Sequence, residues 1–276
     1  MAILIFCILA ISLFGRNENQ SMGARSNGLG NASVTLSDEW AIFNNVAALA
    51  ALDSSYHVSF YFREIYLLPN FRIFGFSTSI PLRKKGVCGL GFYKFGDNLY
   101  NEQKITLGFA HQIRNVALGL QMSYVQLSAL DHRTRGNVLV EFGGIVTLSS
   151  TLKIGAHVYN ATQTQISEQA DEKFSTVMKL GAQYQAGQKV WLYGEVEKNV
   201  LIKESIKMGL EYLIIKNFTI RTGLVTNSTT QSFGFSYKKN QYKFDYAFAW
   251  NEKLGIFNHF SIALFVNKYN VFQLSK

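Results

Sequence analysis

Apolar and polar residues alternate one by one along most of the chain after position 55. In the stretch 243–250, every second residue is aromatic and the residues between are small or charged. Successive side chains of a β-strand point to opposite faces, so such a stretch has one apolar face and one polar face. Fourteen stretches of this kind follow one another. They cover positions 55–63, 71–80, 87–95, 104–113, 116–128, 138–148, 151–159, 174–186, 189–198, 206–215, 218–226, 231–238, 242–250 and 259–266.

The connections between these stretches alternate in length. Short connections lie at 115, 149–150, 187–188, 216–217 and 239–241. Longer connections lie at 64–70, 96–103, 129–137, 160–173, 199–205, 227–230 and 251–258. Outer-membrane barrels have short periplasmic turns and longer outer loops. The sequence therefore predicts an all-β chain that forms a transmembrane antiparallel β-barrel of about 14 strands in a bacterial outer membrane, with both termini periplasmic.

The composition agrees with a membrane barrel and argues against other classes of protein. Charged residues make up 16% of the chain, below the roughly 25% of soluble domains. The 22 Phe and 14 Tyr can supply the outward aromatic girdles of a barrel. The net charge is +9, but the basic residues are scattered, so we expect no nucleic-acid partner. The sequence holds no catalytic motif and no Cys cluster, so we expect no enzyme activity, no metal and no cofactor.

The chain divides into four parts. Positions 1–20 begin with a short apolar run and are predicted to be a signal peptide. Positions 21–54 do not alternate and are predicted to form an N-terminal hatch that fills the barrel, since a barrel of this size otherwise has an open lumen. Positions 55–266 form the barrel, and 267–276 form a C-terminal tail. Within the hatch we expect a helix from Trp40 to Leu49, capped by Ser37.

The hatch carries a recognisable motif. The run GARSNGLGNASV at 23–34 resembles the G-A-R-x-x-G-M-G-x-A-x-V motif of the PorV-like branch of the FadL family, and WAIFNNVAALA at 40–50 resembles the following W-x-x-x-x-N-P-A-G-L-A. The matching positions are Gly23, Ala24, Arg25, Gly28, Gly30, Trp40, Asn45, Ala47 and Leu49. Val46 and Ala48 replace the Pro and Gly of the family, so the chain lacks the proline-fixed kink.

The resemblance implies a fourteen-stranded barrel with a hatch, of a kind found in Bacteroidota, and suggests two functions. The first is a non-enzymatic accessory subunit of a larger outer-membrane complex, for type IX protein secretion or for outer-membrane protein assembly. The alternative is a FadL-type transporter of small hydrophobic molecules. In both cases the expected surroundings are outer-membrane lipids, both lipopolysaccharide and phospholipid.

The inward face of the predicted strands carries charges whose sign alternates between neighbouring strands. This lumen charge ladder consists of Lys179, Glu195, Glu197, Lys207, Glu211 and Arg221. Opposite charges on adjacent strands can pair, so we interpret the ladder as a crosslink of the wall and not as a path for a charged substrate. Three inward aromatic residues, Tyr159, Trp191 and Tyr193, favour the transporter alternative.

Overall fold

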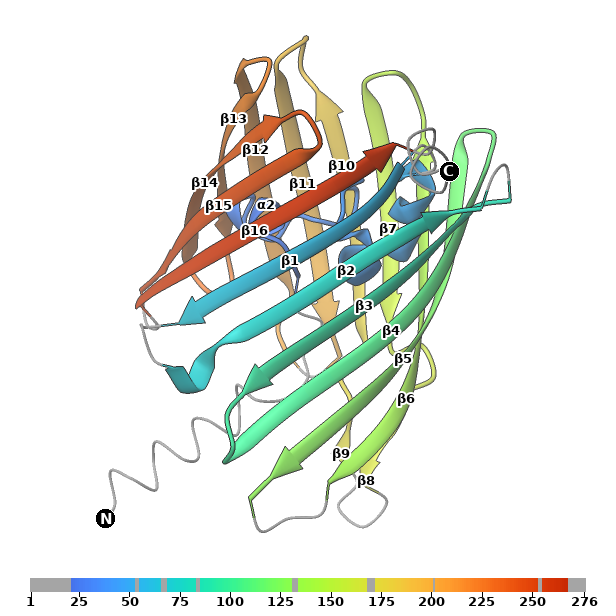
Figure 1. Cartoon of the computed structure of the whole chain (residues 1–276), viewed down its shortest axis with the longest axis vertical. Helices are drawn as coiled ribbons and strands as arrows, with labels where there is room; N and C mark the ends of the chain where they lie inside the picture. The colour runs from blue at the N-terminus through green and yellow to red at the C-terminus, as the bar shows by residue number, and fades with distance from the viewer. Residues whose placement is uncertain are drawn as a thin grey trace, which may run out of the picture.

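The computed structural model describes residues 21–52, 55–65, 69–82, 85–130, 134–167, 172–200, 202–252 and 255–267. Fourteen strands form one closed antiparallel barrel (Figure 1). They are β1 Ser55–Ile65, β2 Ile73–Pro81, β3 Val87–Gly96, β4 Tyr100–Ile113, β5 Val116–Ala129, β6 Arg135–Thr147, β7 Leu152–Tyr159, β10 Val177–Gln185, β11 Val190–Asn199, β12 Ser205–Ile215, β13 Phe218–Val225, β14 Thr230–Lys239, β15 Tyr242–Asn251 and β16 Gly255–Asn267. The predicted signal peptide and all of the predicted tail except Asn267 lie outside the described residues.

Each expected strand corresponds to one barrel strand, with ends that differ by up to four residues. The largest differences are at β4 and β16, which begin four residues earlier than expected, at Tyr100 and Gly255, because these residues still pair with the neighbouring strand. The barrel closes where β1 pairs with β16, with Ser55 opposite Asn267. The alternating pattern therefore predicted the fold class correctly.

The two ends of the barrel differ. The end at which β1 begins, which we call the short-turn end, holds the connections 82–86, 114–115, 148–151, 186–189, 216–217 and 240–241. The opposite end, which we call the loop end, holds the other connections. Among them is the connection from β7 to β10, which contains the small hairpin of β8 Gln165–Ser167 and β9 Glu172–Lys173 at the bottom of Figure 1.

The distribution of side chains on the barrel is the reverse of that in a soluble protein. Leu107 and Leu180 on the outer wall are 62% and 60% exposed, whereas Glu141 and Lys179 on the inner wall are 0% and 2% exposed. Only a lipid environment solvates such an outer wall favourably, and closure of the barrel satisfies the backbone hydrogen bonds. None of the helices in the described part of the chain is long and apolar enough to cross a bilayer.

The hatch lies inside the barrel, as Figure 1 shows for its helices. It contains α2 Ala24–Gly28, α3 Ala41–Asn44 and the 3-10 helix η1 Val46–Leu52. The sequence did not predict α2. The single helix expected from Trp40 to Leu49 is wrong, because Asn45 has an extended backbone, with φ −159° and ψ 110°.

Two side chains explain where the hatch helices begin and break. The expected cap, Ser37, is not used, and instead the Asp38 carboxylate accepts a hydrogen bond of 3.0 Å from the Trp40 backbone N–H. Asn45 leaves the helix because its side chain bonds elsewhere. Its amide donates to the Val34 carbonyl at 2.7 Å, and its side-chain oxygen accepts from the Ala47 N–H at 3.1 Å. Such local bonds of Asp and Asn compete with helical hydrogen bonds.

Candidate functional site

The first half of the hatch motif packs its own residues together. Gly23 has a φ of 93°, and a Cβ atom there would overlap the Trp40 ring. The Trp40 indole is 1% exposed and lies against Phe43 and Tyr61, with ring centroids 6.3 and 5.6 Å away. Glycine at position 23 therefore allows the chain to pass directly over the indole.

Gly30 holds the hatch against the barrel wall. Its φ is 64°, and its backbone N–H donates to the Ser232 hydroxyl at 3.0 Å. A Cβ atom at this position would lie 2.7 Å from the backbone nitrogen of Leu224 in β13. Gly28, in α2, lies in the same way against the Arg221 side chain. These two glycines bring the hatch backbone close to the strands.

Arg25 joins the hatch motif to the lumen charge ladder. Its Nε and Nη2 donate to the two carboxylate oxygens of Glu211 at 3.0 and 2.8 Å. Its Nη1 lies 3.4 Å from an Asp38 oxygen, and Nη2 donates to the Tyr193 hydroxyl at 3.2 Å. A two-pronged contact between guanidinium and carboxylate is among the stronger polar contacts in proteins.

The six ladder residues pair across neighbouring strands. Lys207 Nζ lies 3.0 Å from Glu195 and 2.7 Å from Glu197, and Lys179 lies 3.7 Å from Glu197. Arg221 Nε lies 3.4 Å from Glu211. The ladder also holds the hatch, because one Glu195 oxygen accepts hydrogen bonds of 2.8 Å from the N–H groups of Ser33 and Val34. The predicted ladder and the predicted hatch motif thus form one site.

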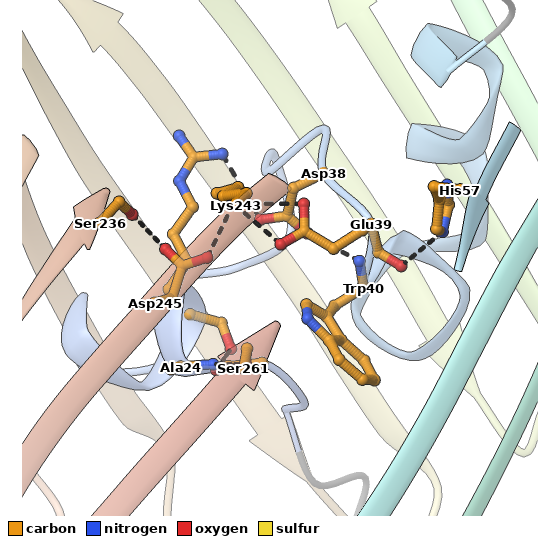
Figure 2. Close-up of polar contacts among 12 residues, drawn as sticks. Ala24, Asp38, Glu39, Trp40, His57, Ser236, Lys243, Asp245 and Ser261 are labelled. Atoms are coloured by element: carbon orange, nitrogen blue, oxygen red, sulfur yellow. Dashed lines mark hydrogen bonds and ion pairs between the residues drawn. The ribbon is translucent and has the colours of Figure 1, made fainter. Parts of the chain in front are cut away.

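The structure adds residues that the sequence prediction of the site missed. Lys243 of β15 lies 2.8 Å from Glu39 of the hatch and 3.1 Å from Asp245 (Figure 2). Asp245 also pairs with Arg221 at 3.0 Å. The Glu39 carbonyl accepts hydrogen bonds from His57 Nε2 at 3.0 Å and from the Ser77 hydroxyl at 2.7 Å. Burial raises the pKa of the Glu39 carboxyl above its ordinary value, and the Lys243 ammonium opposes part of that rise. The signal in the sequence was the acidic pair at positions 38 and 39.

A second buried group of charges lies on β4, β6 and β7. Lys104 donates to Glu141 at 2.6 Å, and His157 Nε2 lies 3.4 Å from the other Glu141 oxygen. The Lys104 Nζ lies 4.8 Å from the centroid of the Tyr159 ring. Because its members come from three barrel strands, this group crosslinks the wall.

The three predicted lumen aromatics do not line one cavity. Tyr159 packs with Val125, Leu139, Phe174 and Val177, whereas Tyr193 and Trp191 pack against hatch residues, including Leu29. The register places Tyr193 opposite Gln183, which lies opposite Lys153 of β7. Lys153 precedes Tyr159 by six residues, about 20 Å along a strand. The three aromatics therefore lie at two separate places in the barrel.

Another row of aromatic side chains leads from the loop end to the hatch. Phe71 and Phe95 have ring centroids 6.5 Å apart at the loop end. On the same face of β3, two residues further into the barrel, Tyr93 lies 6.2 Å from Phe43 of α3, which stacks on Trp40. We call the row of Phe71, Phe95, Tyr93, Phe43 and Trp40 the aromatic path.

The second half of the hatch motif is held by small residues of the wall. The Asn45 amide lies 3.3 Å from the Ala156 carbonyl and 3.4 Å from the Gly144 carbonyl. The Ala47 backbone lies where a Cβ atom on Gly119 would be, and the fully buried Leu49 lies against Gly89. The hatch thus contacts the wall through both halves of its motif. Within the described residues, no group of His, Cys, Asp and Glu side chains could hold a metal ion.

Comparisons with solved structures identify the fold. The CymD monoaromatic hydrocarbon channel superposes with a TM-score of 0.70 and 12% identity over 90% of this chain and 98% of that one. The toluene transporter TbuX of Ralstonia pickettii gives 0.66 and 11%, over 91% and 98%. A FadL homologue of Pseudomonas aeruginosa gives 0.60 and 11%, over 90% and 98%. No protein-family model matches the chain, and no curated protein matches its sequence.

These likenesses correct one prediction from the sequence. The accessory-subunit function is wrong, because the similar barrels are hydrocarbon channels and transporters. The predicted FadL-like character is supported, whereas nothing in these likenesses distinguishes the PorV-like branch, type IX secretion or Bacteroidota. The chain has the fold of FadL-type outer-membrane channels.

Proposed function

We propose that this protein is a gated, non-enzymatic channel of the bacterial outer membrane that admits small hydrophobic molecules. The observation that carries the proposal is the aromatic path, which connects the loop end to the Trp40 ring of the hatch. Aromatic side chains attract apolar molecules by burial of surface and by ring contacts. The hydrocarbon channels with the same fold support this choice of substrate class. The short-turn end, where β1 begins and β16 ends, would then face the periplasm.

The hatch is the gate in this proposal. It is held by hydrogen bonds and ion pairs, such as Ala24 N–H to the Ser261 hydroxyl at 2.8 Å and Lys243 to Glu39 at 2.8 Å. Contacts of this kind break and re-form without a covalent change. In this proposal the observed arrangement of the hatch is the closed state, and passage along the barrel requires part of residues 21–52 to move.

A reversible crosslink tests the proposal. Ala24→Cys with Ser261→Cys, in a chain with Cys88→Ser, places one thiol on the hatch and one on β16. We expect proteoliposomes or cells with this protein to take up labelled toluene when the pair is reduced and to lose uptake when it is oxidised. The single variant Ser261→Cys should be insensitive to oxidant. Equal uptake in the oxidised and reduced states would show that hatch movement is not needed, and no uptake above empty membranes would reject the channel.

A further inference from the structure

Aromatic side chains are concentrated on one side of the outer wall of the barrel. Around the seam of β1 and β16, the outward residues of one cross-strand row are Phe92, Phe76, Phe60, Ile262, Phe244 and Tyr237, each opposite the next. On β4 and β5, by contrast, most of the large hydrophobic residues exposed on the outer wall are aliphatic, such as Leu107, Leu118 and Leu120. Contact with lipid alone does not require this asymmetry, because aliphatic side chains pack against acyl chains as well as aromatic side chains do.

A hollow of about 420 Å³ lies in this aromatic side. The rings of Phe60, Phe76, Phe244 and Phe260 line it, together with Ile262. The ring centroids of Phe60 and Phe76 are 5.5 Å apart, so the rings support one another. This hollow, which we call the groove, has the apolar lining that an acyl chain requires.

The groove continues toward the short-turn end. A second hollow of about 370 Å³ shares Phe244 and Ile262 with it and is bounded by Tyr237, Lys239 and Tyr242. Lys239 is the last residue of β14 and is exposed. Tyrosines at the edge of the apolar band mark the headgroup level of a membrane. The hollow at Lys239 therefore lies at the height of lipid headgroups.

The short-turn end as a whole is positive. Exposed basic residues stand at five of its six turns, namely Lys85, Arg114, Lys189, Lys216 and Lys239. The sequence has no Asp or Glu in 82–86, 114–115, 148–151, 186–189, 216–217 or 240–241. The loop end, in contrast, carries both signs, as in the Arg72–Glu64 pair. A uniformly basic end attracts anionic membrane surfaces.

We propose that the joined hollows bind one anionic glycerophospholipid, with its phosphate at Lys239 and an acyl chain between the rings of Phe60, Phe76, Phe244 and Phe260. Charge complementarity and the continuity of the two hollows select this occupant. Phospholipid is also the lipid of the leaflet that the short turns of outer-membrane barrels face. The site is separate from the hatch and does not depend on transport.

Native mass spectrometry of the detergent-solubilised full chain tests this site, with dioleoylphosphatidylglycerol and dioleoylphosphatidylcholine as probes. We expect one tight phosphatidylglycerol site, with about fivefold weaker binding of phosphatidylcholine, as about 1 kcal/mol per basic residue implies. Lys239→Gln should remove this preference, and Phe60→Ala should weaken binding of both lipids.

Two matched controls separate this site from general effects. Lys238→Gln removes the same charge from the same hairpin, but Lys238 lies over the Phe265 ring, with Nζ 5.3 Å from its centroid, on the lumen side. Phe142→Ala removes an exposed ring from β6, outside the aromatic side. We expect neither to change lipid binding. Equal affinity of the wild type for the two lipids, equal effects of the two lysine changes, or equal effects of the two phenylalanine changes would overturn the proposal.

Discussion

Arg25 of the hatch and Glu211 of β12 are 186 positions apart in sequence and are joined by two hydrogen bonds of 3.0 and 2.8 Å. The pair connects the first half of the hatch motif to the lumen charge ladder. The Glu211 side chain is 7% exposed, so it depends on Arg25 and Arg221 to offset its lost hydration. The contact therefore matters both to the seating of the hatch and to the wall.

Arg25→Gln should loosen the hatch. It leaves Glu211 with Arg221 alone and removes two charge-assisted hydrogen bonds, at a cost of about 1–3 kcal/mol. Amide hydrogen exchange in α2 should accelerate accordingly. Arg72→Gln breaks a pair of the same 2.8 Å length with Glu64 at the loop end, where the Arg72 side chain is 39% exposed. That control should cost less than about 1 kcal/mol. Similar exchange in both variants would show that Arg25 does not hold the hatch.

Gly30→Ala should displace the hatch from β13. The left-handed backbone alone costs about 1–2 kcal/mol for alanine, and the new methyl group would also meet the Leu224 backbone. Gly187→Ala is the matched control, because Gly187 has a φ of 85° and a Cβ atom added there would meet no other atom within 4 Å. The difference in unfolding free energy between the two variants measures the close approach. If both variants lose the same unfolding free energy, the close approach of the hatch to β13 does not contribute to stability.

The barrel could be predicted from the sequence because its information is local. A segment such as Tyr242–Asn251 shows its two faces in its own residues, and neighbouring segments repeat the pattern. The ladder followed from the same alternation, since Lys207 and Glu195 are directly opposite in the register. The residues that face lipid and those that face the lumen could therefore be assigned without knowledge of the tertiary structure.

The hatch could be predicted only in outline. Asn45 breaks the expected helix through bonds to Val34 and to the barrel wall, and its sequence neighbours do not reveal those partners. In the same way, Lys243 and Glu39 are 204 positions apart, and their contact depends on how deeply the hatch sits. The accessory-subunit function inferred from the motif was wrong for a related reason. The motif residues hold the hatch against the barrel wall, and such contacts do not specify a function.

Lys243→Gln should lower the unfolding free energy of the protein more than Arg72→Gln, which breaks an exposed ion pair. Lys243 lies between Glu39 and Asp245, and its loss leaves buried carboxylates close together. Breaking a buried ion pair costs about 3–5 kcal/mol. The double variant Lys243→Gln with Glu39→Gln should recover part of this loss, since one unpaired charge is removed with its partner. Protease resistance and hydrogen exchange around Trp40 measure both, and the absence of any rescue would contradict the pairing.

Phe95→Ala should reduce uptake while the hatch stays seated. Phe95 is half-buried at the loop end of the aromatic path and contacts Phe71 and Tyr100, with ring centroids 6.5 and 6.4 Å away. A ring contact contributes about 0.5–1.5 kcal/mol beyond area burial, so the toluene concentration for half-maximal uptake should rise about twofold to tenfold. Phe109→Ala removes an exposed ring from the outer wall of β4 and should leave uptake unchanged. The helix α2 packs mainly against β14 and β15, and β15 lies four strands along the wall from β3. Unchanged hydrogen exchange in α2 would therefore assign the loss of uptake to the aromatic path. An unaltered uptake curve would instead show that apolar molecules do not enter beside Phe95.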